Sequence, residues 1–253
     1  EEPCISGSRG SGTVFFSGCS LNCCFCQNYE ISAGKYGKEV SIERLRKIYE
    51  ELIAQGVHNI NLVNPTHYAH VVIQSLTQAP PVPVIYNCGG YETKDTLEKL
   101  KGKIQIYLPD LKYALSESAA RYSRAPDYFQ YAQEAIREMY LQTGPYELDK
   151  EGILQKGVLI RHLVLPGQLE NTRRVIQWVG KNFDSGEVLF SLMGQYVPCG
   201  DAAAFPEIYR PLTAEEYEIA KGYLEEYGIT DGYVQELDSA DEAYIPPFDL
   251  SGV

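Results

Sequence analysis

The stretch GTVFFSGCSLNCCFCQNYEIS, residues 12–32, sets the fold and the chemistry that the rest of the chain must fit. Its first part, Thr13–Ser17, is short, β-rich and mostly apolar, which is typical of a strand buried on both faces of a parallel sheet. The loop that follows packs four cysteines into eight positions, from Cys19 to Cys26. Parallel α/β proteins carry their functional groups on loops leaving the carboxyl ends of strands. The position of this loop therefore predicts a functional site.

Five further segments have the same short, mostly apolar character and predict strands of the same sheet. The complete set is Thr13–Ser17, Asn59–Val63, Val82–Tyr86, Ile104–Leu108, Val158–Val164 and Glu187–Leu192. Amphipathic segments between them predict helices over residues 41–56, 95–102, 127–144, 171–183 and 213–228. Ser41 and Gly56 are start and stop signals for the first of these, and Thr213 with Glu216 makes a capping box for the last.

Alternating strands and helices imply right-handed β-α-β units around a parallel sheet. Six units are too few for an eight-fold barrel, so we predict an α/β fold with an open, partial β/α barrel over residues 12–237. Residues 1–11 form an N-terminal segment without an initiator Met, and we expect sequence to be missing upstream of it. The acidic, Pro-containing tail 238–253 is expected to wrap the surface or to be loosely ordered.

The composition of the chain argues against some binding partners and indicates a reducing compartment. A net charge of −12 argues against a nucleic-acid or anionic-membrane surface, because either needs clustered Lys and Arg. No stretch approaches 18 uncharged apolar residues, so no membrane span is predicted. The seven cysteines are odd in number and four are crowded, which makes a poor disulfide framework and favours metal or redox chemistry in a reduced, cytoplasmic protein.

The spacing Cys19-x3-Cys23-x2-Cys26 predicts three ligands on one loop. A structural zinc site needs four ligands, usually as two pairs, and the sequence offers no second pair and no nearby His. Three thiolates would instead hold three irons of a 4Fe–4S cluster and leave the fourth open. Zinc or a redox-inert loop is the alternative. Cys24 is expected to pack or to be a loose thiol, because a fourth thiolate would close the site.

This spacing resembles that of the radical S-adenosylmethionine (SAM) enzymes, and the resemblance extends over nearly the whole chain. It is strongest to the pyruvate formate-lyase activating enzyme group and its stand-alone relatives. The segments that carry it are SGC…CQNYEIS, NLVNPTHY, YNCGGYE, PDLKY, RHLVLPG and LMGQYVP. The resemblance implies a 4Fe–4S cluster on Cys19, Cys23 and Cys26, with SAM bound at its open iron.

The resemblance also implies SAM-binding positions near the cysteine loop. Phe25 would supply an apolar face for the adenine, with the backbone at Asn28 beside it. Many members carry Gly-Gly-Glu after the second strand to bind the SAM amino group, whereas this chain has Asn64-Pro65-Thr66-His67. Asn64 and Thr66 can accept from an ammonium but lack the charge of Glu. His67 is expected either to donate to substrate or to cap the following helix.

Further positions follow from the later strands. Asn87 would stand near the ribose, and Asp110 with Lys112 would orient the SAM carboxylate directly or through a monovalent cation near Asp110. Arg161 matches an arginine that contacts SAM, although a structural ion pair would satisfy it equally well. Gln195, with its neighbour Tyr196, would reach ribose or substrate. Cys88 is expected to be a buried small hydrophobe.

The implied reaction is reductive cleavage of SAM followed by hydrogen abstraction, with the chemistry carried by cluster and SAM rather than by a catalytic side chain. A glycyl-radical activase is the leading hypothesis, with a flavodoxin- or ferredoxin-like electron donor and a protein substrate. A radical SAM enzyme acting on a small molecule or a protein side chain is the alternative. An iron–sulfur electron-transfer module without SAM cleavage is a third.

The ligand set predicts the outcome of four substitutions. Cys19→Ala, Cys23→Ala or Cys26→Ala should each prevent stable cluster assembly, because each removes one of three ligands. Cys24→Ser should retain the cluster. Iron content after anaerobic reconstitution measures this, and a Cys24 variant that loses iron as fully as the other three would contradict the assignment.

Overall fold

The computed structural model describes residues 2–235, 237, 248–250 and 252–253. Its strands are β1 (Gly12–Phe15), β2 (Ile60–Val63), β3 (Val84–Cys88), β4 (Ile106–Pro109), β5 (Glu147–Leu148), β6 (Leu154–Leu163), β7 (Leu189–Met193) and β8 (Gly232–Gln235). Its helices are α1 (Pro3–Ser6), α2 (Tyr29–Ser32), α3 (Ile42–Ala54), α4 (Ala69–Ser75), α5 (Lys94–Leu100), α6 (Ser116–Ser123), α7 (Tyr128–Thr143), α8 (Leu169–Asn182) and α9 (Ala214–Glu226), with 3-10 turns η1 (Thr66–Tyr68) and η2 (Ala202–Ala204).

The strands form one open sheet in the order β1-β2-β3-β4-β6-β7-β8, and each neighbouring pair along this path is parallel. The predicted partial barrel is confirmed, but the strand number is larger than the six expected. The additional parallel strand, β8, alternates exposed and half-buried residues and begins with a glycine, so it lacks the apolar run used to find the others. The short β5 pairs antiparallel with β6.

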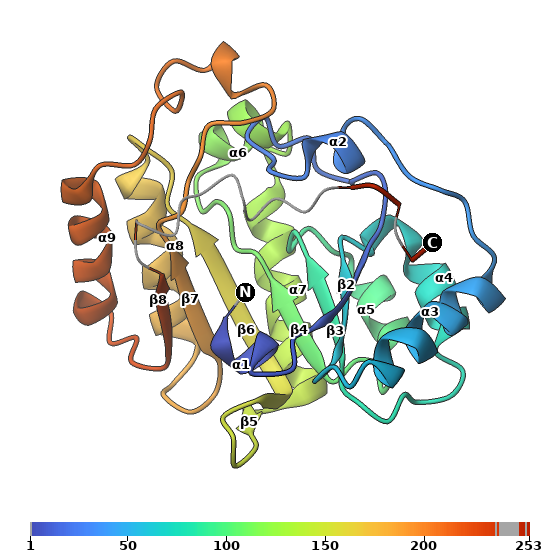
Figure 1. The fold of residues 1–253 in the computed structure, drawn as a ribbon. Coiled ribbons are helices and arrows are strands. Elements are labelled where there is room, and N and C mark those ends of the chain that lie inside the picture. The colour runs from blue at the N-terminus through green and yellow to red at the C-terminus, as the bar shows by residue number, and fades with distance from the viewer. Residues whose placement is uncertain (1, 236, 238–247, 251) are drawn as a thin grey trace.

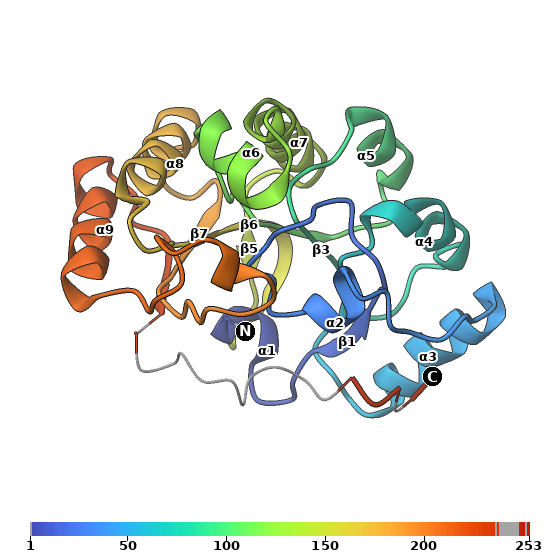
Figure 2. The same ribbon diagram turned by 90° about the horizontal axis from the view of Figure 1, so that it is seen from above.

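Helices cover the outer face of the sheet, as Figure 2 shows for the arc from α3 to α9. The predicted caps are present: the Ser41 side chain accepts from the Arg44 backbone N–H, and Thr213 and Glu216 form the reciprocal capping box. On α3, Leu45 and Tyr49 are buried against the sheet. This packing buries the larger of two apolar clusters.

The inner, concave face of the sheet carries a second, smaller cluster. Its members come from α1 and from inward positions of four strands: Cys4, Ile5, Ile85, Ile106, Leu108, Leu154, Leu159 and Leu189. The short helix α1 lies against this face in Figure 1. Because Cys4 and Ile5 are almost fully buried there, α1 fills the end of the barrel at the amino ends of the strands.

Only part of the predicted tail belongs to the described residues, since residues 238–247 and 251 lie outside them. Phe248 packs edge-on against the Phe15 ring on β1, with ring centroids 5.4 Å apart. The carbonyl of Val253 accepts from Lys38 Nζ at 2.9 Å. Among the described residues, no helix has both the length and the hydropathy needed to cross a bilayer.

The loops after the strands gather at one end of the sheet, at the top of Figure 1. At that end Gly90 has φ 76°, and a Cβ built on it would lie 2.2 Å from the carbonyl oxygen of Asp110. The loop after β3 therefore lies directly against the backbone that carries Asp110, and only glycine allows this contact.

This close approach predicts a large cost for Gly90→Ala. Any non-glycine residue at positive φ costs about 1–2 kcal/mol, and here a backbone clash adds to that strain. Gly102→Ala is the matched control, because Gly102 has φ 78° and no atom lies within 4 Å of the place that its Cβ would take. Urea denaturation should show Gly90→Ala losing at least about 2 kcal/mol more than Gly102→Ala. Equal losses would contradict the contact.

Candidate metal and cofactor site

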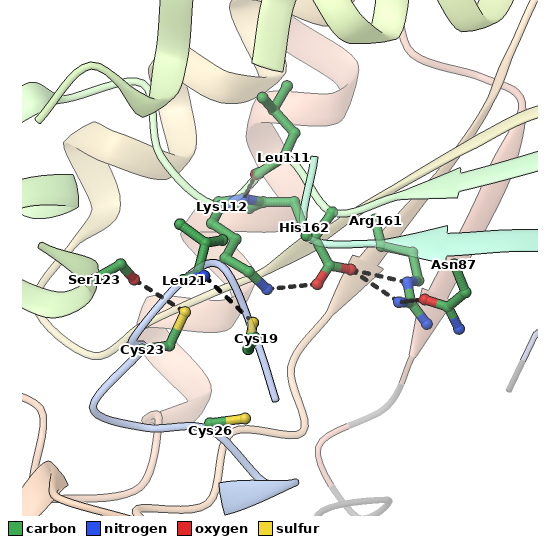
Figure 3. Close-up of polar contacts among 12 residues, drawn as sticks. Cys19, Leu21, Cys23, Cys26, Asn87, Leu111, Lys112, Ser123, Arg161 and His162 are labelled. Carbon is green, nitrogen blue, oxygen red and sulfur yellow. Dashed lines mark hydrogen bonds and ion pairs between the residues drawn. The ribbon is translucent and has the colours of Figure 1, made fainter. Parts of the chain in front are cut away.

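The three predicted ligands lie on the loop between β1 and α2. Cys19, Cys23 and Cys26 are free, half-buried cysteines along this loop. Figure 3 shows the three cysteines along the loop, with the Lys112 side chain extending toward them from the segment after β4. Cys24, by contrast, is buried in the larger apolar cluster, and its backbone N–H donates to the Tyr122 carbonyl at 2.8 Å. Its backbone thus joins the loop to α6 while its thiol packs.

Each of the three sulfur atoms accepts a hydrogen bond. The backbone N–H of Leu21 donates to Cys19 Sγ at 3.4 Å, Ser123 Oγ donates to Cys23 Sγ at 3.0 Å, and Ser32 Oγ donates to Cys26 Sγ at 3.2 Å. Donors around a sulfur favour the thiolate, which is the form that binds metal.

Burial works against the thiolate form when no metal is bound. It raises the pKa of Cys23 to about 12, although Lys112 and Ser123 act in the opposite direction. The pKa of Cys19 is also raised by burial, against hydrogen bonds from Leu21 and Asn64. Metal binding must therefore displace protons here, as expected for cysteine ligands.

The arrangement of the thiols bears on which metal they suit. In the described part of the chain, no group of three or more His, Cys, Asp or Glu side chains is placed to hold a single metal ion. A 4Fe–4S cluster binds each thiolate through a different iron, so its ligands need not converge on one point. Three hydrogen-bonded cysteines on one loop fit such a cluster better than they fit a four-ligand zinc site.

A charged group lies at the carboxyl ends of β4 and β6, beside the cysteines. Asp110 accepts from Lys112 Nζ at 2.5 Å and from Arg161 Nε at 3.0 Å, and Arg161 also donates to Asn87 Oδ1 at 2.6 Å. These side chains are about one-fifth exposed: 19% for Asp110, 20% for Lys112 and 17% for Arg161. Among the described residues, Lys112 and Arg161 both contact the one carboxylate of Asp110.

Protonation of this group follows from its mutual contacts. Burial alone would raise the pKa of Asp110, but Lys112 and Arg161 outweigh it and hold that pKa below its usual range. Burial likewise disfavours the Lys112 ammonium, and the attraction of Asp110 reverses this and raises the pKa of Lys112. All three groups are therefore ionised at neutral pH. Arg161 forms an ion pair with Asp110, and its contact with SAM stays a prediction.

Buried polar side chains that the sequence did not single out fix the backbone beneath this group. The single hydroxyl hydrogen of Tyr128 is shared between the carbonyls of Gly89 and Asp110, and Tyr128 Oη accepts from the Lys112 N–H. His162 Nδ1 lies 2.7 Å from the Leu111 carbonyl, and burial lowers the His162 pKa to about 4, so the ring is neutral. Tyr128 and His162 resembled ordinary core residues in the sequence, and no local signal marks this role.

The Asn64-Pro65-Thr66-His67 segment contacts the start of the cysteine loop. Asn64, at φ 59°, donates through Nδ2 to the Gly18 carbonyl, and His67 Nε2 lies 2.7 Å from the Ser17 carbonyl. His67 therefore contacts the cysteine loop and does not cap the helix that follows it. Thr66 Oγ1 donates to a carboxylate that sequence analysis missed, Glu92, at 2.5 Å.

Glu92 is almost fully buried at the end of the loop after β3. Its carboxylate also accepts from Tyr86 Oη at 3.4 Å and lies near the Cys88 thiol. Burial raises the Glu92 pKa to about 7, although Thr66, Tyr86 and Cys88 favour the charged form. Cys88 itself is 3% exposed and packs in the larger apolar cluster, as predicted.

The remaining predicted positions lie at the other side of the cysteine loop. Phe25 is buried and meets the Tyr196 ring edge-on, with centroids 6.0 Å apart. Asn28 stands at the start of α2 without a side-chain capping bond. Tyr196 Oη donates to the Ile208 carbonyl at 2.8 Å, so its hydroxyl is directed into the core, whereas Gln195 is half-buried in the loop after β7.

Comparison with known proteins identifies the family to which this site belongs. The sequence profile of the radical SAM superfamily matches residues 13–179, which include the cysteine loop and the charged group. The chain belongs to the radical SAM superfamily. A relative from Methanocaldococcus jannaschii, the uncharacterized protein MJ0674, is 31% identical over 220 residues, covering 83% of this chain and 60% of that protein. The chain thus spans only part of the length of that relative.

Solved structures share the radical SAM fold with this chain. A spore photoproduct lyase variant superposes with a TM-score of 0.59 at 12% identity, covering 87% of this chain and 74% of that one. SuiB of Streptococcus suis, solved bound to the precursor peptide SuiA, gives 0.58 at 14% identity and covers 90% and 50%. HydG, a maturase of the [FeFe]-hydrogenase, gives 0.53 at 14%, covering 92% and 53%. At these identities the likeness establishes the fold alone.

Membership of the radical SAM superfamily gives the cofactors, a 4Fe–4S cluster and SAM. One spore photoproduct lyase structure holds bound AdoMet, which is SAM. In this chain Cys19, Cys23 and Cys26 are the residues whose chemistry and placement fit the cluster. The positions named above for SAM remain predictions.

The buried carboxyl of Glu92 predicts how stability changes with pH. Between the pKa of an unfolded Glu, about 4.3, and its folded value of about 7, the folded protein holds a proton that the unfolded chain releases. Stability should therefore fall as pH rises through this window and level off above it. Urea midpoints of the cluster-loaded protein from pH 5 to 8 measure this.

Glu92→Gln should flatten that slope, which is worth up to about 4 kcal/mol of unfolding free energy across the window. The exposed Glu225→Gln is the control and should leave the slope intact. A slope unchanged in Glu92→Gln would show that the carboxyl is already ionised in the folded protein.

Proposed function

We propose that this radical SAM enzyme abstracts hydrogen from the glycyl backbone of a protein substrate, as a glycyl-radical activase. When bound, the cluster and SAM supply the electron and the 5′-deoxyadenosyl radical that such a reaction needs. The chain itself supplies the ligands for the cluster, a charged surface for SAM and a path for the substrate. Each contribution is supported by a feature of the described residues.

The charged group suits the zwitterionic end of SAM. The Lys112 ammonium and the Arg161 guanidinium can each attract a carboxylate, and both cations are already held in place by Asp110. We assign the SAM carboxylate to this group. Asn87, which already accepts from Arg161, would then stand beside the same ligand.

The open sheet is the observation that carries the choice of a protein substrate. The two terminal strands of the sheet path, β1 and β8, do not pair with each other in the described part of the chain. The sheet is therefore open along one side in the described part of the chain, and we take this side as the entry for an extended peptide segment. A closed barrel would restrict access to the loop end.

The inner face near this opening also suits peptide groups. Because side chains alternate along a strand, Ser191 lies on the same inner face as Leu189, a member of the smaller cluster. Arg161 on β6 is the register partner of Ser191 on β7. Ser191 Oγ is fully buried and makes no hydrogen bond with the described residues, so its hydrogen-bonding capacity is unused within them. Within the same described set, Gln235 Oε1 on β8 is likewise buried without a hydrogen bond.

Electrons must reach the cluster from another protein, and we propose a flavodoxin- or ferredoxin-like donor. There are two alternatives to a glycyl-radical activase. One is a radical SAM enzyme that acts on a small molecule or a protein side chain, and the other is an electron-transfer module that does not cleave SAM. SuiB, which shares the fold, was solved with a precursor peptide, so this fold can accommodate a peptide.

Anaerobic incubation of the reconstituted protein with SAM and a chemical reductant tests the enzyme class. We expect equal amounts of 5′-deoxyadenosine and methionine, and none from Cys26→Ala, which lacks a cluster ligand. A cluster-loaded protein that forms no 5′-deoxyadenosine would instead be an electron-transfer module.

The substrate is tested with a glycyl-radical enzyme made with deuterated glycine. Transfer of deuterium into 5′-deoxyadenosine, together with a glycyl radical signal in electron paramagnetic resonance, is the expected result. Abundant 5′-deoxyadenosine without deuterium and without the radical signal would exclude the activase assignment and favour the other substrate classes.

A further inference from the structure

Ser123 contacts one of the three ligand cysteines from far away in the sequence. It lies at the end of α6 and donates through Oγ to Cys23 Sγ at 3.0 Å, across 100 residues of sequence. The two elements are also joined by the bond from the Cys24 N–H to the Tyr122 carbonyl. The position of Ser123 beside the sulfur is therefore fixed by a backbone contact between neighbouring residues.

A second hydroxyl stands behind Ser123. Tyr113 Oη lies 2.7 Å from Ser123 Oγ, and both residues are almost fully buried, with exposures of 0% and 2%. Ser123 has one hydroxyl hydrogen, and a thiolate accepts hydrogen bonds but donates none. When Cys23 is a thiolate, Ser123 must give its hydrogen to the sulfur. Tyr113 then donates to Ser123, and the two bonds form a relay that ends on Cys23.

The relay differs from the donors to the other two ligands. Cys19 accepts from the backbone of Leu21 within the same loop, and Cys26 accepts from Ser32 six residues away. In a chain of hydrogen bonds each bond polarises the next, so the bond from Ser123 to sulfur is strengthened by Tyr113. Cys23 is thus the ligand on which a buried pair of hydroxyls acts in series.

We propose that Ser123, polarised by Tyr113, raises the reduction potential of the cluster held by Cys19, Cys23 and Cys26. Reduction adds negative charge that spreads onto the ligand sulfurs, and a donor to sulfur stabilises that charge. The buried position of the relay makes the effect larger, because water does not replace a lost donor. Ser123 is thus a positioning and tuning residue that touches a ligand, not the substrate.

The proposal rests on the cluster and not on the identity of the substrate. It is tested by a redox titration of the reconstituted protein, which needs no substrate. Failure of the activase assignment would leave this measurement unchanged, and failure of the relay would leave 5′-deoxyadenosine formation intact. The two proposals therefore fail separately.

The midpoint potential of the cluster, followed by electron paramagnetic resonance in anaerobic redox titration, is the readout. Ser123→Ala should lower the ratio of reduced to oxidised cluster at fixed potential by about threefold to tenfold, where tenfold corresponds to about 59 mV for one electron. Tyr113→Phe should shift the ratio in the same direction by less. The double variant should match Ser123→Ala, because Tyr113 acts only through Ser123.

Ser118→Ala is the matched control. Ser118 lies on the same helix, is also buried, and donates to Gln168 Oε1 at 2.8 Å instead of to a sulfur. Its substitution should leave the midpoint potential unchanged. Iron content, measured in every variant, confirms that the cluster is assembled.

Two results would overturn the proposal. One is a fully iron-loaded Ser123→Ala protein with the midpoint potential of the wild type. The other is a shift in Ser118→Ala as large as that in Ser123→Ala, which would assign the effect to helix α6 in general. If Ser123→Ala fails to assemble a cluster, Tyr113→Phe decides, since it leaves the contact to Cys23 in place; an unchanged potential there would then refute the relay.

Discussion

The ion pairing of Asp110 with Lys112 and Arg161 is the interaction on which the site depends. Each of these charges would be costly to bury alone, and together they satisfy one another at the carboxyl ends of β4 and β6. Lys112 lies close enough to the cysteine loop to favour the thiolate of Cys23, although burial raises the pKa of that thiol overall. The metal ligands and the charged group are thus one electrostatic unit.

The backbone around this unit is held by uncharged groups rather than by further ions. Tyr128 joins the loops after β3 and β4, and His162 joins the loop after β4 to β6. The low pKa of His162 keeps its ring neutral, so it adds no charge beside Lys112. The charged residues thus supply the electrostatics of the site while these neutral residues set its shape.

Local patterns in the sequence were sufficient for the class of fold and for a loop that fits the cluster. Apolar runs located six of the strands, and the Cys19-x3-Cys23-x2-Cys26 spacing located the candidate ligands, because both are properties of short segments. The strand β8 was missed because its place in the sheet comes from tertiary contacts and not from an apolar run. The contacts that link distant segments were beyond local patterns for the same reason. Ser123 meets Cys23 only because α6 folds back onto the cysteine loop, and Glu92 resembled an ordinary loop carboxylate until its burial beside Thr66 distinguished it.

The helix α1 has a consequence for how a reaction can proceed in this barrel. Because Ile5 and Cys4 are packed at the amino ends of the strands, that end of the barrel is closed, and no ligand can leave through that end. Spent methionine and nucleoside must therefore leave either through the loop end or past the unpaired edges of β1 and β8.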